Sequence, residues 1–523
     1  MAFQVSPGVA YSEVDLSTTI PTTSVSDAGF IGYFTKGPIK EVVKISSENE
    51  LVEIFGKPTS DNSADWFTAA SFLSYGGSLQ IVNVSTGTNA YSGNLADAGD
   101  TIVIENEADF ESTDLGTDQP AVVFVAKSVG QSGNTLSVTV LDSSHSDGNY
   151  PDISENDEIH VLVKDGDIVK ESWLFLNTTS GEKGLDGKNI YYRDVINAES
   201  NLIYAGPGNY TTNSTSNTFD GGTITIGSDT SGDYDDGTSL LADKDKVELS
   251  ILISGDQEVS GNGPSGLAAS RKDCVAFYSP KLSDVLGNGT MSAKTTAVTS
   301  SATTNNVGST SYSFMDSGWK KMYDKYNDTW VNVPLNGDVA GLCVATDESR
   351  GSWYSPAGFN RGQIKNCAGL LFDPDKTSRD TLYKNNVNPV VAFPGEGYVL
   401  FGDKTRQLKP SAFDRLNVRR LFITLEKTIS NSAKYSLFEF NDEFTRGQFK
   451  STVEPYLRNI KAQRGIVDYL VVCDESNNTP AVIDNNEFVG DIFIKPSRSV
   501  NFIQLNFVAV RTGVNFQEVV GAV

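Results

Sequence analysis

The pattern of apolar and polar residues is most regular in the last quarter of the chain. Ser411 and Asp414 are spaced like a capping box, in which two side chains cap the first turn of a helix. The apolar residues that follow recur every three or four positions, as on one face of a helix: Val418, Leu421, Phe422, Leu425 and Ile429. A second stripe has the same spacing: Phe449, Val453, Tyr456 and Ile460. These patterns predict two amphipathic helices.

The residues around the second helix predict its ends and the strands that accompany it. Asn441 is a suitable N-cap, and Gly465 is placed as a C-terminal glycine. Apolar runs predict buried strands at Val467–Cys473 and Ile492–Ile494, and Tyr435–Phe440 is a further strand candidate. Residues 401–500 are therefore expected to form a compact α/β unit.

Both ends of the chain contain strand-forming residues that have no partner nearby in the sequence. Within residues 1–25 the breaker pairs Pro7-Gly8 and Ile20-Pro21 bracket a strand candidate, and residues 501–523 are rich in Val and Phe. A strand at a chain end needs a sheet edge, in its own subunit or in another. We expect both segments to be arms. The candidate pairing residues are Val9, Tyr11, Val14, Leu505, Phe507, Val514, Phe516 and Val519.

Residues 26–85 and 241–400 share a pattern of buried strands and helices. Strands are predicted at Ala28–Thr35, Leu79–Val84, Val247–Ile253 and Cys274–Tyr278. Ser47 and Glu50 are spaced as a capping box that starts a short helix. Lys294–Ser311, rich in Thr, Ser and Asn, is expected to be a flexible loop. We expect the two segments to form one discontinuous α/β domain.

The segment between them, residues 86–240, has a different character. Short strands are predicted at Ala121–Ala126, Thr135–Leu141, Ile159–Lys164 and Trp173–Leu176, with turns rich in Gly, Asp and Ser between them. Asn209–Asp236 consists almost entirely of small polar residues and is expected to be a surface loop. The pattern indicates an inserted all-β domain.

Charge is distributed unevenly along the chain. There are 41 basic and 66 acidic residues, a net charge of −25. Residues 401–523 hold 16 and 14 of these, or +2, so that residues 1–400 hold 25 and 52, or −27. An acidic surface opposes binding to nucleic acid. A nearly neutral block joined to acidic ones suggests that the former is buried in an assembly, and ordinary variation between domains is the alternative.

Composition also bears on the cellular compartment. No apolar run approaches the roughly 20 residues of a membrane helix, so we expect no membrane insertion. The four cysteines are widely spaced and form no CxxC pair, which disfavours a zinc ribbon or a disulfide framework. Reduced thiols in a protein made in a cytosol fit this spacing better.

Residues that could support catalysis are few. A Ser-His-Asp triad would need His145 or His160, and a structural or solvated role suits both better. Ser265 lacks the second glycine of a GxSxG elbow, and no pair of carboxylates is singled out by its spacing. We expect no enzymatic activity, no cofactor and no metal site. A hydrolase is the alternative.

Arg415, Arg419 and Arg420 lie near the start of the first C-terminal helix and form a candidate basic patch. The interpretation favoured by the net charge is a solvated face with carboxylates nearby, Asp414 among them. The alternative is a contact with an acidic protein partner, and nucleic acid is disfavoured.

Several segments, in one order along the chain, resemble the contractile tail sheath protein of myoviruses. At the start these are SPGVAYSEVD (6–15), FIG (30–32), KGP (36–38) and the capped helix from Ser47 to Gly56. Towards the end they are SPAGFNRG (355–362), NVRRL (417–421), LFEFND (437–442) and CDESNNTP (473–480). The resemblance covers residues 1–85 and 340–523 and leaves about 86–330 unmatched.

The resemblance implies a structural protein that transmits force. Such sheaths stack hexameric rings into a helix around a rigid tube, and subunit arms pair with the cores of neighbours. The implied partners are copies of the chain, the tail tube protein, and baseplate and tail terminator proteins, with assembly in the host cytoplasm and a final place in the virion. Arg415, Arg419 and Arg420 then become candidate contacts to the tube or to a neighbour. A sheath of a phage-derived injection system or bacteriocin is the nearest alternative.

The expected fold is therefore a multidomain α+β protein. Its predicted parts are an N-terminal arm (1–25), a discontinuous α/β domain (26–85 and 241–400), an inserted all-β outer domain (86–240), a C-terminal α/β core (401–500) and a C-terminal arm (501–523). Head-to-tail contacts that do not close on themselves propagate a helix, as such an assembly requires.

Overall fold

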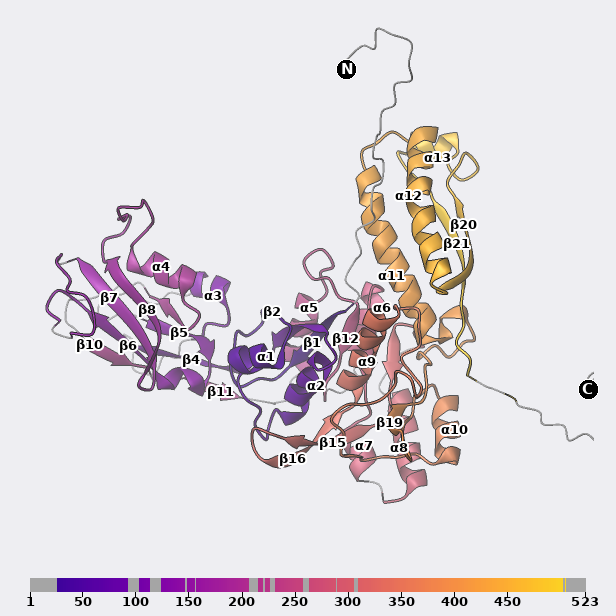
Figure 1. Ribbon diagram of the computed structural model, residues 1–523, viewed down its shortest axis with the longest axis horizontal. Helices are drawn as coiled ribbons and strands as arrows, with labels where there is room; N and C mark the ends of the chain where they lie inside the picture. Colours follow the sequence, from indigo (N-terminus) through magenta and orange to yellow (C-terminus); the bar gives the residue numbers. More distant parts are fainter. Residues whose placement is uncertain are drawn as a thin grey trace, which may run out of the picture.

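The computed structural model describes residues 26–92, 103–112, 124–145, 148–155, 157–206, 215–219, 222–225, 231–256, 263–287, 289–304, 309–501 and 504. Figure 1 shows three blocks: an insertion at one end of the molecule, a central unit, and a C-terminal unit that rises from the central one. The residues predicted to pair in the two arms lie outside the described residues.

A six-stranded sheet forms the middle of the central unit. Five strands run parallel, and their order is β14 (Ser313–Met315), β13 (Val275–Tyr278), β12 (Ile251–Ile253), β1 (Asp27–Gly32) and β3 (Ser78–Asn83). At one edge β2 (Val42–Ile45) pairs with β3 in the antiparallel direction. Because β1 lies between β12 and β3, strands from residues 26–85 and from residues 241–400 share one sheet. Parallel strands are buried on both faces, which explains their continuous apolar runs.

Helices cover this sheet and fix the spacing between its layers. The main ones are α1 (Glu48–Phe55), α2 (Ser63–Leu73), α6 (Pro264–Arg271) and α9 (Asn336–Ser349). The predicted cap of α1 is confirmed, since Ser47 Oγ accepts from the Glu50 amide at 3.3 Å. Helix α2 packs closely on α9, where a Cβ added at Gly337 would lie 2.5 Å from the Thr68 carbonyl oxygen. No other residue fits that crossing without displacing backbone.

Smaller elements complete the central unit. A three-stranded antiparallel sheet contains β15 (Trp319–Asp324), β16 (Thr329–Pro334) and β17 (Gly369–Leu370), and a hairpin contains β18 (Val390–Phe393) and β19 (Gly397–Leu400). The helices are α5 (Ser231–Leu240), α7 (Leu282–Leu286), α8 (Met291–Thr304) and α10 (Lys376–Lys384).

Helix α8 corrects the loop predicted at Lys294–Ser311. Its threonine hydroxyls donate back along the helix, as Thr295 does to Met291 O at 2.8 Å, and Val298 and Ala302 are buried.

The insertion contains two four-stranded sheets. One has the order β10 (Thr215–Thr218), β6 (Leu136–Leu141), β7 (Glu158–Asp165), β8 (Ile168–Asn177), and the other has the order β11 (Thr223–Thr225), β4 (Thr86–Ser92), β5 (Phe124–Val129), β9 (Ile203–Ala205). A 3-10 turn spans Gln131–Thr135, and two helices, α3 (Glu107–Ser112) and α4 (Tyr192–Glu199), accompany them. The all-β prediction is therefore wrong. Tyr192 and Ile196, four positions apart, bury one face of α4 against the strands.

The C-terminal limit of the insertion also differs from the prediction. Residues 209–236 were expected to be loop, but strands β10 and β11 and the start of α5 fall within them. Helix α5 packs on the central sheet rather than on the insertion, because the Tyr234 hydroxyl donates to Ile31 O of β1 at 3.2 Å. Residues 231–240 thus belong structurally to the central unit.

Two helices and a hairpin form the C-terminal unit. They are α11 (Leu416–Ala433), α12 (Glu443–Ala462), β20 (Ile466–Val472) and β21 (Asp491–Pro496), with the short helix α13 (Pro480–Asp484) and 3-10 turns at Ala412–Asp414 and Lys434–Ser436. Both predicted helices and both predicted strands are present. The N-cap of α12 is Asp442 rather than Asn441. The Asp442 carboxylate accepts from the Thr445 amide at 2.8 Å, and this hydrogen bond lowers its pKa. Asn441 instead donates to Glu487 O.

Helix α11 begins later than the capping pattern predicts. Ser411 caps the 3-10 turn, and Arg415 is extended because it bridges Lys404 in a short antiparallel pairing. The strand predicted at Tyr435–Phe440 is absent: those residues form a turn and a loop.

Two arginines fasten α11 to the central unit. The guanidinium of Arg420 meets the carboxylate of Asp347, on α9, through two contacts, one of which is 2.8 Å. Burial raises the pKa of Asp347 and Arg420 counteracts it, whereas in Arg420 the effect of Asp347 outweighs that of burial and the pKa is raised. Arg419 lies 3.9 Å from the ring centre of Phe413 and donates to the Tyr312 hydroxyl at 2.9 Å. The prediction of a solvated face is wrong for both, because each is buried within its own chain.

We predict that Asp347→Asn loosens the junction between α9 and α11. The substitution leaves Arg420 buried without its charge partner, which costs about 3–5 kcal/mol in such pairs. This loss of free energy should make hydrogen exchange of the α11 amides in the monomer faster than in the unchanged protein. As a control, Asp468→Asn breaks the Lys461–Asp468 pair, whose side chains are 46% and 55% exposed, and should leave exchange of the α11 amides close to that of the unchanged protein. Equal protection of α11 in the two variants would show that the pair does not hold the junction.

Candidate assembly interface

The β20–β21 hairpin has one face on the helices and one face towards solvent. Ile466 and Val471 are buried among the apolar side chains of α11 and α12, together with Leu421, Leu425, Phe449, Val453, Leu457 and Ile460. On the other face Leu470 lies opposite Phe493, and these side chains are 57% and 59% exposed. Two large apolar residues are thus paired across the strands on the side that the described residues leave uncovered.

Both outer edges of this hairpin are open. Among the described strands β20 pairs only with β21, and β21 only with β20. Each strand therefore presents one row of backbone N–H and C=O groups that no described strand pairs. A two-stranded ribbon is marginally stable by itself, and open edges with apolar side chains readily accept further strands. The hairpin can bind an extended segment by main-chain hydrogen bonds.

A second apolar surface lies at the end of the same unit. We call residues 434–444, the connection from α11 to α12 together with the first two residues of α12, the apical loop. Its exposed aromatic and aliphatic side chains are Tyr435, Leu437, Phe438, Phe440 and Phe444. Phe438 has a φ of 68°, in the left-handed region, so that the loop holds an apolar side chain outward in a backbone conformation that costs energy. Figure 1 shows this loop at the tip of the C-terminal unit, away from the central sheet.

The structure separates the three arginines that were predicted as contacts. Arg419 and Arg420 face inward, as described above. Arg415 keeps a side-chain exposure of 19% and lies 3.7 Å from Asp403 Oδ1, while it donates to the Tyr383 hydroxyl at 3.0 Å. A contact of Arg415 with a tube or a neighbour stays a prediction. The exposed aromatic residues of the apical loop were missed because the strand pattern at 435–440 suggested burial.

The two histidines lie together in the insertion and serve its packing. Their rings meet edge to face, with centres 5.8 Å apart. His160 is buried, its Nδ1 accepts from the Phe175 amide at 2.9 Å, and its Nε2 lies 3.1 Å from Pro151 O. Both ring nitrogens of His160 are thus engaged with backbone, which supports the structural role predicted for it.

The described part of the chain has two features that bear on other functions. It contains no group of three or more His, Cys, Asp or Glu side chains placed to hold a metal ion. None of its helices has the length and apolar character needed to cross a bilayer.

Comparisons with known proteins agree with the resemblance. Residues 269–406 match the family model of the phage tail sheath protein central domain, and residues 408–509 match that of the phage tail sheath C-terminal domain. The chain is 32% identical to the tail sheath protein of Vibrio phage KVP40, with 99% of this chain and 100% of that protein covered. It is 30% identical to the tail sheath protein of Enterobacteria phage T4, with 99% of each covered.

Solved structures share the fold at low identity. The sheath tail protein of Listeria innocua has a TM-score of 0.56 at 12% identity, with 92% of this chain and 97% of that one covered. The anti-feeding prophage helical sheath in its contracted state has a TM-score of 0.54 at 13% identity, with coverage of 97% and 99%. The likeness in sequence over nearly the whole chain, together with the shared fold, places this chain in the family of phage tail sheath proteins.

Proposed function

We propose that the chain is the repeating subunit of a contractile phage tail sheath, in which copies exchange terminal strands. Residues 1–25 and 501–523 of neighbouring copies add to the open edges of the β20–β21 hairpin. The observation that carries this proposal is the hairpin itself: two free edges and an uncovered apolar row on a unit whose other face is packed. Tail sheath proteins are structural components of virions, and the related proteins are not enzymes.

The proposed assembly is a helix of stacked hexameric rings around a tube. Strand exchange links the copies by main-chain bonds while the segment that precedes each strand stays free to turn, so that the link survives large rotations. Contraction is then a change from a metastable to a more stable packing. The free energy released is modest for each subunit and large when summed over the whole lattice. The tube protein, baseplate and terminator proteins are the partners that this function requires. A sheath of an injection system would use the same contacts.

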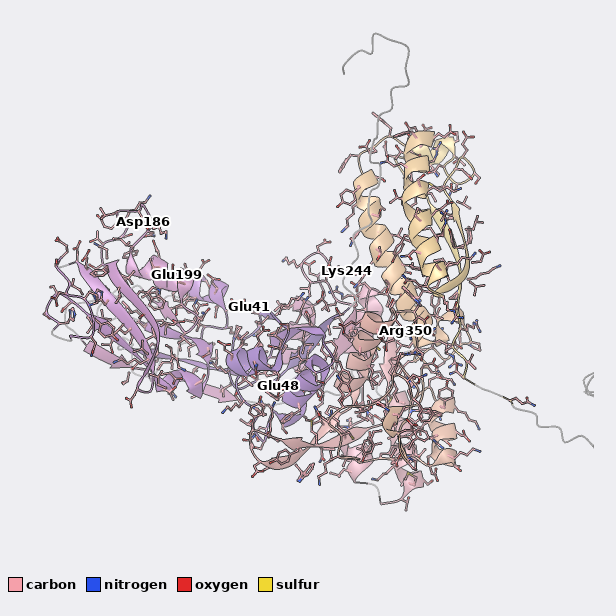
Figure 2. All side chains as sticks on the ribbon, in the orientation of Figure 1. Glu41, Glu48, Asp186, Glu199, Lys244 and Arg350 are labelled. Carbon is pink, nitrogen blue, oxygen red and sulfur yellow. The ribbon has the colours of Figure 1, made fainter. Side chains whose placement is uncertain are left out.

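We place the insertion on the outside of the sheath. It lies at the opposite end of the molecule from the C-terminal unit (Figure 1), and residues 1–400 carry most of the acidic charge. In Figure 2 the labelled Asp186 and Glu199 project from the insertion, whereas the labelled Arg350 lies beside the C-terminal unit. A charged, well-solvated block fits an outer surface, and a nearly neutral one fits the inner mesh.

We predict that deletion of residues 515–523 abolishes polymerisation without unfolding the subunit, because the hairpin edge of a neighbour then lacks its added strand. Negative-stain electron microscopy should show monomers or small oligomers in place of tubes. The circular dichroism spectrum should match that of the full chain. Normal tubes from the truncated protein would contradict strand exchange by this segment.

The acceptor side gives a second prediction. Phe493→Glu places a charge on the exposed face of β21 and should raise the concentration needed for polymerisation at least about tenfold, because the same-face side chains of an added strand would pack beside Phe493. Ile168→Glu is the matched control. Ile168 is an equally exposed apolar residue, on strand β8 of the insertion, and its replacement should leave polymerisation unchanged. Equal effects of the two changes would point to general solubility rather than to the hairpin.

Excision of the insertion gives a third prediction. Removal of residues 86–225 keeps α5 on the central sheet and should spare polymerisation. Removal of residues 86–240 also removes α5 and its bond from Tyr234 to Ile31, and should lower the thermal stability of the subunit. Loss of assembly in the first variant, with the monomer folded, would place the insertion in the inner mesh.

A further inference from the structure

A cavity lies where the chain leaves the hairpin. It has a volume of about 780 Å³ and is bounded by residues 353–361, helix α10, residues 401–403 and residues 497–501. Arg464, the second residue after α12, closes one side. The cavity thus touches both the central and the C-terminal unit, beside the point where residues 502–523 begin.

The charge of this cavity is unusual for so acidic a chain. Its lining includes four guanidinium groups, those of Arg361, Arg379, Arg464 and Arg498, and the ammonium group of Lys376. None of the five forms an ion pair with a described carboxylate.

Two of the arginines are held in place by aromatic rings rather than by acids. The guanidinium of Arg379 lies 5.7 Å from the ring centre of Phe393 and 5.9 Å from that of Phe401. The guanidinium of Arg361 lies 5.5 Å from the ring centre of Tyr354, and its Nε donates to Ser355 O at 3.0 Å. Stacking orients a guanidinium and leaves its positive charge uncompensated.

The lining contains two carboxylates, and one of them is already engaged. Asp403 is buried and accepts hydrogen bonds from Ser499 Oγ at 2.7 Å and from Asn501 Nδ2 at 2.9 Å. It therefore fixes the first residues of the C-terminal segment and offers little to the other cations. Asp380 is exposed on α10. The cavity retains a net positive charge.

We propose that this cavity binds the acidic pair Glu13 and Asp15 of a second copy of the chain. Residues 1–25 contain these two acidic residues and no Lys or Arg, so the segment is complementary in charge. In an extended strand residues 13 and 15 project from the same face, and guanidinium groups bind carboxylates with two parallel hydrogen bonds. The proposal rests on the exchange of terminal strands and adds where the N-terminal strand of a neighbour is anchored and by what chemistry.

Charge exchange tests the pairing. Arg361→Glu with Arg379→Glu should raise the concentration needed for polymerisation about tenfold or more, because carboxylates then face carboxylates. Glu13→Arg with Asp15→Arg should act in the same way, and the four changes together should restore polymerisation to within about threefold. Lys384→Glu is the matched control, on the same helix α10 but outside the cavity lining, and should have no effect. Circular dichroism of each monomer checks folding.

Cross-linking identifies the occupant directly. A photoreactive benzoyl-phenylalanine in place of Phe401 should, in sheaths assembled from mixed ¹⁴N- and ¹⁵N-labelled copies, bond to residues 1–25 carrying the other isotope. Cross-links within one copy, to another segment of the chain or to the tube protein would overturn the proposal. Failure of the variant with all four charge changes to polymerise would also overturn it. If both double variants assemble normally while the 515–523 deletion does not, the acidic anchor is wrong and strand exchange stands. If the deletion also assembles normally, strand exchange itself is wrong.

Discussion

Two unpaired strand edges are the constraint on which this structure depends. The chain forms a two-stranded hairpin on a pair of helices, and none of the other described strands pairs with it on either side. Water can form hydrogen bonds with the backbone N–H and C=O groups on an edge. The exposed side chains of Leu470 and Phe493 are stabilised only when other apolar groups exclude water from them. A subunit built in this way is stable enough to fold and incomplete enough to assemble. Under the proposed strand exchange, the strand-forming residues at both ends of the chain are the segments that complete this sheet in a neighbouring copy.

In the proposed function, force applied at the hairpin has to reach the rest of the subunit, and helix α11 is the element that connects the two. Its N-terminal half is fixed to the central unit by Arg419 and Arg420, and further along Lys427 Nζ contacts Leu249 O and Ser250 Oγ. Its other face packs on α12 and the hairpin. Helix α11 is thus packed against both units, whereas the insertion is joined to the central unit away from this helix (Figure 1).

The sequence predicted the parts of the fold that follow from local periodicity and missed those that depend on tertiary contacts. The stripe at Val418, Leu421 and Leu425 located α11, and the apolar runs located β20 and β21, because spacing alone determines which face is buried. Helix α8 was missed because its many threonines gave the segment the composition of a loop, although Val298 and Ala302 are buried. The arginines of α11 were assigned to the surface, since nothing local shows that Asp347, far along the chain, supplies the partner charge. The cationic cavity was not predicted for the same reason: its five cations come from four separate segments of the chain.

The central claim is that copies of the chain complete one another's sheets. The most direct measurement is an electron cryomicroscopy map of a polymerised sheath, at a resolution that traces the main chain of residues 1–25 and 505–523. Strand exchange predicts that the β20–β21 hairpin becomes the middle of a larger sheet whose outer strands belong to other copies. A map in which both terminal segments fold back on their own subunit, with the hairpin edges still open, would contradict it.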